Sequence, residues 1–281
     1  MPLSHALPFL LESDSDLGQK ATRICRWHAI ARRSPAERQG LHRVIPYNSL
    51  VGNRAYLSVW CREFSEATLP FTFQSFLDTV PVSKSRAGFT QLTIRAVSHG
   101  EPPAIEHDLR GQPLNAAEIV AAASEILHDD VCYEVEAHWD LWSYDVKQKA
   151  WRLGPQRLEI LCQGEQYDDG ACEQSGHFCV DLGFEDLFTG EGNLIGRADA
   201  PALMPEQSPD GEEHPTQKEL LQFLAQPGRR REVQEKTRSN ILGLQDWMGR
   251  ILSELPVVGV RLWSEGEENF EDRVDAILAA E

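Results

Sequence analysis

The stretch from Val131 to Leu141, VCYEVEAHWDL, carries the clearest pattern in this sequence. Its odd-numbered residues are apolar, whereas four of its five even-numbered residues carry a carboxylate or an imidazole. Successive side chains of a strand point to opposite faces of a sheet, so sustained alternation indicates a strand that is buried on one face only. We therefore predict a half-buried strand over residues 131–141.

Further strands are expected on either side of this one. Residues 89–97, 151–162 and 178–184 each have the length and composition of a strand, and the second is expected to be irregular at Gly154-Pro155. Short polar connections join the last two strands to the one before, and such connections favour antiparallel pairing. The centre of the chain is therefore expected to hold an antiparallel sheet.

Helices are expected both between and after these strands. Asn115 is typical of a helix N-cap, with Glu118 in the first turn of a helix that runs to about His128. A second helix is predicted over 231–254, and its buried stripe should consist of Val233, Thr237, Ile241, Leu244, Met248, Ile251 and Leu255. A strand at 257–263 and a helix at 270–280 should follow.

The N-terminal part is less regular. Leu17, Ala21, Ile24, His28 and Ala31 recur at helical spacing, which indicates a helix before Ser34-Pro35. A strand is expected at 56–61, followed by a strand and loop region rich in Phe and Thr.

Together these elements predict an α+β fold, with a mainly antiparallel sheet and helices packed on one of its faces. The expected organisation is a basic helical segment at 1–54, a central sheet domain at 55–190, and a flexible acidic Pro/Gly-rich loop at 191–215. Residues 216–281 should supply C-terminal helices and one strand to the same domain.

The charge of the chain is strongly acidic. It has 44 Asp and Glu against 27 Lys and Arg, a formal net charge of −17, although residues 1–54 are locally basic. An acidic surface repels phosphate backbones, so general nucleic-acid binding is disfavoured and a basic protein partner is the expected complement. The alternative interpretation of the acidity is that it only maintains solubility.

The cysteines and the N-terminal residues indicate in which cellular compartment the protein is expected. The six cysteines form no CxxC pair, and the first residues lack the basic region of a signal peptide. No apolar run approaches the ~20 residues that a membrane-spanning helix needs. We expect a cytoplasmic protein with six reduced thiols and no membrane association.

The sequence contains none of the common catalytic signatures. Walker A, GxGxxG, GxSxG and HExxH patterns are all missing from the printed sequence, so no cofactor is expected and no family is assigned. Asp145-Val146-Lys147 has the spacing of part of a nuclease site, but it falls in an expected turn. The polar tract from Asp168 to His177 lacks the ligand positions of a calcium loop.

The candidate site is the open face of the predicted sheet. If the strands at 131–141 and 176–185 share this sheet, its uncovered face displays five candidate binding residues: Glu134, Glu136, His138, His177 and Asp181. Such a face suits a non-enzymatic binding protein, inhibitor-like or immunity-like, that recognises a basic protein. The alternative is a metal-dependent or acid–base-dependent hydrolase that uses the same histidines and carboxylates.

Overall fold

The fold is described from a computed structural model, which covers residues 53–145, 148, 150–190 and 228–279. The predicted helix before Ser34-Pro35 and the predicted loop at 191–215 lie outside these residues. The basic segment at 1–54 does too, except for its last two residues.

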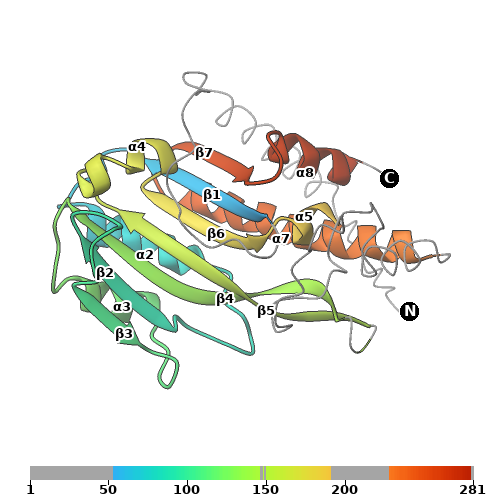
Figure 1. Ribbon diagram of the computed structural model, residues 1–281, viewed down its shortest axis with the longest axis horizontal. Helices are drawn as coiled ribbons and strands as arrows, with labels where there is room; N and C mark the ends of the chain where they lie inside the picture. Colours follow the sequence, from blue (N-terminus) through green and yellow to red (C-terminus); the bar gives the residue numbers. More distant parts are fainter. Residues whose placement is uncertain (1–52, 146–147, 149, 191–227, 280–281) are drawn as a thin grey trace, which may run out of the picture.

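The described chain forms a seven-stranded sheet in which every neighbouring pair of strands is antiparallel. The strand order is β3-β2-β4-β5-β6-β1-β7 (Figure 1). The strands are β1 (Arg54–Cys61), β2 (Gln91–Ala96), β3 (Ile105–Asp108), β4 (Val131–Asp145), β5 (Ala150–Gln163), β6 (Phe178–Phe184) and β7 (Val257–Ser264).

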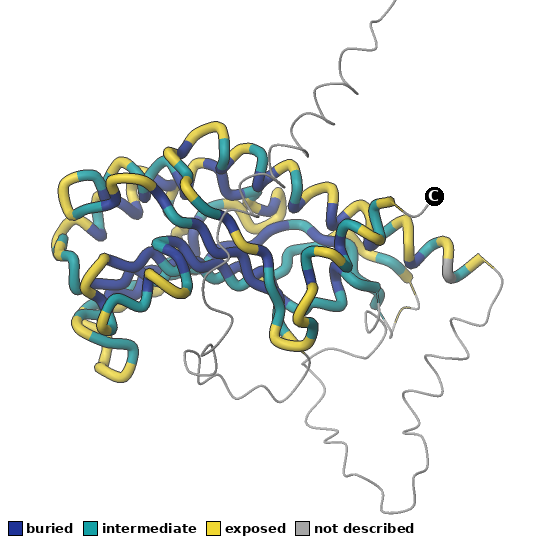
Figure 2. The backbone as a smooth tube through the Cα atoms, turned by 90° about the horizontal axis from the view of Figure 1, so that it is seen from above, coloured by how far each residue is buried: buried dark blue, intermediate teal, exposed yellow. Residues whose placement is uncertain are grey.

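Helices pack against one face of this sheet (Figures 1 and 2). The longer ones are α2 (Leu69–Thr79), α3 (Ala116–Ala123), α7 (Arg229–Glu254) and α8 (Phe270–Ala279). Shorter turns are η1 (Tyr167–Asp169), α4 (Cys172–Ser175) and α5 (Asp186–Thr189). The α+β class predicted from the sequence is confirmed, and none of the described helices is both long and apolar enough to cross a bilayer.

Aromatic side chains join the helices to the sheet. Phe76 of α2 stacks on Phe178 of β6 at 4.2 Å between ring centroids, and Trp247 of α7 meets Trp139 of β4 at 5.7 Å. Burying rings of this size removes a large apolar area from water and contributes much of the stability. One continuous core therefore forms between the helices and this face of the sheet.

The alternation predicted for the central strands is confirmed. Tyr133, Val135, Val180 and Leu182 are fully buried, whereas Glu134 and Glu136 lie on the opposite face. β4 and β6 are not direct neighbours, because β5 lies between them and pairs antiparallel with both.

The helix signals around Asn115 and in α7 are also confirmed. The Asn115 side chain accepts the Glu118 N–H and the Glu118 carboxylate accepts the Asn115 N–H, which forms a capping box. This helix ends at Ala123, five residues earlier than expected. All seven residues of the predicted α7 stripe are buried.

Three local predictions are wrong. The Phe/Thr-rich region after Cys61 contains α2, because Leu69, Phe73, Phe76 and Leu77 form a buried helical stripe and Pro70 sits in the first turn. The loop after residue 97 contains the short edge strand β3. The pairing of β4 with β5 continues through Gly154-Pro155 without the expected irregularity.

The second face of the sheet, which we call the open face, is partly covered by the β5–β6 connection. The Trp60 indole N–H donates to the Cys172 carbonyl at 3.0 Å, and the Gln163 amide donates to the Ser175 hydroxyl at 3.0 Å. These contacts hold α4 over the end of the sheet where Cys132 and Cys179 lie buried. The remainder of the open face extends from Glu134 toward the far end of β4.

Candidate functional site

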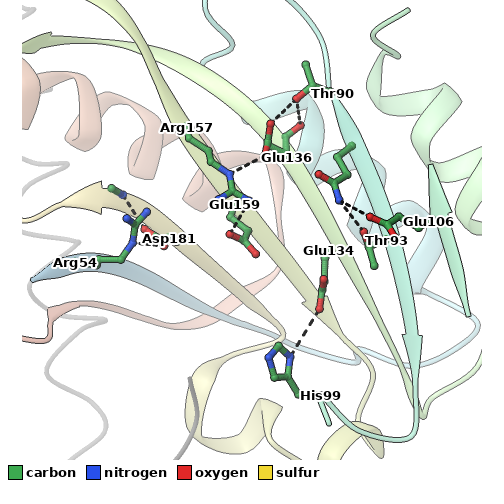
Figure 3. A network of polar contacts seen from close by, with 12 residues as sticks. Arg54, Thr90, Thr93, His99, Glu106, Glu134, Glu136, Arg157, Glu159 and Asp181 are labelled. Carbon is green, nitrogen blue, oxygen red and sulfur yellow. Dashed lines mark hydrogen bonds and ion pairs between the residues drawn. The ribbon is translucent and has the colours of Figure 1, made fainter. Parts of the chain in front are cut away.

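Two of the five candidate residues, Glu136 and Asp181, lie on either side of Glu159 on the open face. Glu136 of β4 lies opposite Glu159 of β5, and Glu159 lies opposite Asp181 of β6. We call these three residues the carboxylate row (Figure 3). Glu134 lies two residues along β4 on the same face.

The carboxylate row is only partly exposed. Its side chains retain 16–17% of their accessible surface. Like charges directly opposite each other on neighbouring strands destabilise a sheet. The row therefore requires compensating cations, and the arginines around it provide them.

Two arginines of the described chain form ion pairs with these carboxylates. Arg157 donates from Nε to Glu136 at 2.6 Å and lies 3.3 Å from Glu159 through Nη2, so one guanidinium serves two carboxylates. Arg54 donates from Nε to Asp181 at 2.5 Å. Thr90 adds a hydroxyl donor to Glu136 at 3.0 Å (Figure 3). Within the part of the chain that the structure describes, Arg157 thus serves both glutamates and Arg54 serves Asp181.

The backbone at the start of β1 directs Arg54 toward Asp181. The β1–β6 register shifts between Ala55 and Tyr56, and Gly183 opposite this shift has a φ of 100°, a conformation that L side chains rarely adopt. Asp181 also accepts the Gly183 N–H at 2.9 Å. Burial nevertheless raises the pKa of Asp181 above its ordinary value, against the opposing effect of Arg54.

Glu134 belongs to a separate pair. It accepts a hydrogen bond from Arg95 Nε at 2.6 Å, and His99 Nδ1 lies 3.8 Å from the same carboxylate oxygen (Figure 3). Only 13% of its side-chain surface is exposed, less than a solvated sheet face would give. Glu134 is thus neutralised within the chain.

His138 lies on the same side of β4 but is covered by the segment before β2. Its side chain is buried, and its Nε2 lies 3.1 Å from Arg86 Nη1. A guanidinium only donates, so Nε2 is the acceptor and the ring is neutral. Nδ1 is buried and has no hydrogen-bond partner. Burial, together with Arg86, lowers the pKa of His138.

His177 lies away from the carboxylates, just before β6. Its Nδ1 accepts the Cys61 N–H at 3.0 Å, and its ring stacks on Phe64 at 4.3 Å between centroids. Burial lowers the pKa of His177. These contacts give His177 a role in joining β1 to β6.

The structure thus brings together Glu136 and Asp181, leaves Glu134 nearby, and separates both candidate histidines from them. Within the described ranges, no group of three or more His, Cys, Asp or Glu residues is arranged to hold a metal ion. Among the described histidines, His99 is the one whose ring lies within 4 Å of a candidate carboxylate, and it was not among the candidates predicted from the sequence.

Glu159 and the three arginines are the functional candidates that sequence reasoning missed. Glu159 alternates with Leu158, Ile160 and Cys162, all of which are buried. That alternation was the available signal for an outward carboxylate. The arginine partners carry no such local signal, because they come from different strands.

No family model, no curated protein and no solved structure matches this chain. The candidate function therefore depends on the residues and their geometry.

Proposed function

We propose that this protein is a non-enzymatic cytoplasmic recognition protein whose open sheet face binds a basic protein partner, as an inhibitor or immunity-type protein does. The observation that carries the proposal is the carboxylate row, in which Glu136, Glu159 and Asp181 lie side by side on three neighbouring strands. Among the described residues, Arg54 pairs with Asp181, whereas Arg157 divides its guanidinium between Glu136 and Glu159. A cationic side chain of a partner can join the two carboxylates that share Arg157.

The partial burial of the row favours a specific interaction. Fully exposed ion pairs contribute only about 0–1 kcal/mol, because water and salt screen them. Carboxylates that keep one sixth of their exposed surface have already lost most of their hydration. Contacts within the fold already offset the free-energy cost of removing this water. A smaller part of that cost therefore opposes the binding of a partner.

Arg157 marks the place where a partner's cation can reach the row. Half of its side-chain surface is exposed, although it contacts both Glu136 and Glu159. An arginine or lysine of the partner can approach from the open face and share these carboxylates. The overall acidity of the chain would accelerate the encounter by electrostatic steering.

The hydrolase alternative has less support. It requires an imidazole close to a carboxylate and open to a substrate. His138 contacts Arg86 and is buried, and His177 accepts a backbone N–H and stacks on Phe64. Neither ring is arranged for proton transfer with the row. His99 lies 3.8 Å from a Glu134 oxygen, but that oxygen already accepts a hydrogen bond from Arg95.

The cytoplasmic part of the proposal is supported by the thiols. The five described cysteines are free: Cys61, Cys132, Cys162, Cys172 and Cys179. Disulfides are rare in reducing compartments, so free buried thiols are consistent with a cytoplasmic protein.

The proposal is tested by affinity purification of the full-length protein from its native cell with quantitative mass spectrometry. The test variant is the double substitution Glu136→Gln and Glu159→Gln, which removes two charges from the row. The matched control is Glu66→Gln with Glu125→Gln, which removes the same charge from exposed positions beside α2 and α3.

We expect a basic protein to be retained by the wild type and by the control, and to be depleted at least about tenfold with the row variant, a loss of about 1.4 kcal/mol. Equal retention of the basic protein by both double variants contradicts the proposal. Capture of a specific partner that is not basic also contradicts it.

A further inference from the structure

β4 and β5 continue as a two-stranded ribbon beyond their neighbours (Figure 1). β2 pairs with β4 only as far as Glu136, and β6 pairs with β5 only as far as Glu159, whereas the β4–β5 pairing continues to Asp145 and Ala150. A two-stranded ribbon is at best marginally stable by itself. This one is held by α7 and by the segment around Val82.

A small apolar pocket lies where the ribbon meets α7. Its volume is about 210 Å³, and its lining includes Val82, Trp142, Leu153 and Gly243. Leu153 is 54% exposed and Val82 is 40% exposed, which is high for large aliphatic side chains. Ordinary ligand pockets measure ~300–1,000 Å³, so this one suits a single side chain rather than a small molecule.

The pocket has a preformed wall. Lys236 Nζ lies 3.5 Å from the centre of the Trp142 ring, a cation–π contact that fixes the indole. The backbone N–H and carbonyl of Trp142 are hydrogen-bonded to the Asn240 side chain of α7. A rigid aromatic wall lowers the entropy cost of accepting a partner's side chain.

The pocket and the carboxylate row share one face of β5. Leu153 and Glu159 are six residues apart on β5, and side chains an even number of residues apart point to the same face. Arg157 lies between them on that face, with half of its side-chain surface exposed. At ~3.3 Å per residue the separation of Leu153 and Glu159 is about 20 Å. One extended segment of a partner can therefore contact both.

We infer that the basic partner of the carboxylate row anchors one apolar side chain in this pocket, at a distance of about six extended residues from the lysine or arginine that meets the row. The inference rests on the proposed function and adds the second element of recognition. Apolar anchors in desolvated pockets supply most of the binding energy in many interfaces, while surrounding charges select the partner.

The test uses a phage-displayed library of random 16-residue peptides and the full-length protein. Peptides selected on the wild type are then measured against Leu153→Asp, which places a charge at the pocket. Leu242→Asp is the matched control, since Leu242 is 47% exposed on α7 and is not part of the pocket lining. Urea unfolding verifies that each variant is folded.

We expect the selected peptides to share a bulky apolar residue and a Lys or Arg about six positions away. Leu153→Asp should weaken them at least tenfold, and Leu242→Asp should leave them unchanged. Peptides without a shared apolar position, equal binding to Leu153→Asp, or no enrichment at all would overturn the inference. Apolar peptides that bind the pocket without a basic residue also overturn it. If binding also survives Glu136→Gln with Glu159→Gln, the proposed function fails separately.

Discussion

Asn240 of α7 hydrogen-bonds to both backbone groups of Trp142 in β4. Its Oδ1 accepts the Trp142 N–H at 2.8 Å, and its Nδ2 donates to the Trp142 carbonyl at 2.9 Å. The same Nδ2 donates to the Leu187 carbonyl at 2.9 Å. One buried amide thus takes the place of a neighbouring strand in the part of β4 that extends beyond its pairing with β2.

We predict that Asn240→Ala destabilises the protein by about 2–4 kcal/mol, because three backbone groups lose their partner in a buried position. Urea unfolding monitored by tryptophan fluorescence measures the change. Ser239→Ala on the exposed side of the same helix is the control and should change stability by less than about 0.5 kcal/mol. An Asn240→Ala protein as stable as this control would contradict the assigned role.

The carboxylate row leads to an opposite prediction for stability. Glu159 is the middle one of three opposed carboxylates, so Glu159→Gln relieves repulsion on both sides. We expect the variant to be as stable as the wild type or more stable by about 0.2–1 kcal/mol. Thermal unfolding at low salt provides the measurement. A large loss of stability would indicate that the row exists to hold the sheet together.

Histidine titration should make the fold sensitive to acid. The pKa values of His138 and His177 are lowered in the folded protein, mainly by burial, so the unfolded chain binds more protons than the folded one once the pH falls below their ordinary value of 6.5. Stability is therefore retained above pH 6.5 and is lost as the pH falls below it.

Unfolding free energies measured between pH 7.5 and 5 test this sensitivity. His177→Gln and His138→Gln should each flatten the dependence below pH 6.5, because each removes one of the two rings whose pKa is lowered by burial. The account of the two rings fails if neither substitution alters the slope.

The thiols provide an independent prediction. Burial raises the pKa values of Cys61 and Cys179 to about 12 and those of Cys132 and Cys162 well above the ordinary value. Because the thiolate is the reactive form, these groups should resist alkylation in the native protein at pH 8. Under denaturing, non-reducing conditions all six cysteines should be labelled. Mass spectrometry counts the labels, and a deficit of two would indicate a disulfide.

Local patterns predicted much of this fold. The alternation in 131–141 identified the buried face of β4, and the α7 stripe identified seven buried positions. Both succeed because the period of the pattern is set by the geometry of one element. The helix α2 was not predicted, because its Phe and Thr residues favour strands by propensity. Packing against Phe178 and Trp247 outweighs that preference in the fold.

The candidate site was less predictable, because it depends on strand order. The sequence indicates that Glu136 and Asp181 point outward, but only the position of β5 between their strands places Glu159 beside both. Arg54 and Arg157 reach the row from β1 and β5, and no local pattern encodes that approach. Asn240 had a weak signal, a polar residue within the apolar stripe of α7.

The central claim is that the carboxylate row, rather than the overall acidity, recognises cationic partners. Titration calorimetry with an oligo-arginine peptide tests it on three full-length proteins: the wild type, Glu136→Gln with Glu159→Gln, and the exposed control Glu66→Gln with Glu125→Gln. We predict that the row variant binds at least about tenfold more weakly and that the control binds like the wild type. Equal weakening in both double variants would contradict the claim, because net charge alone would then explain the binding.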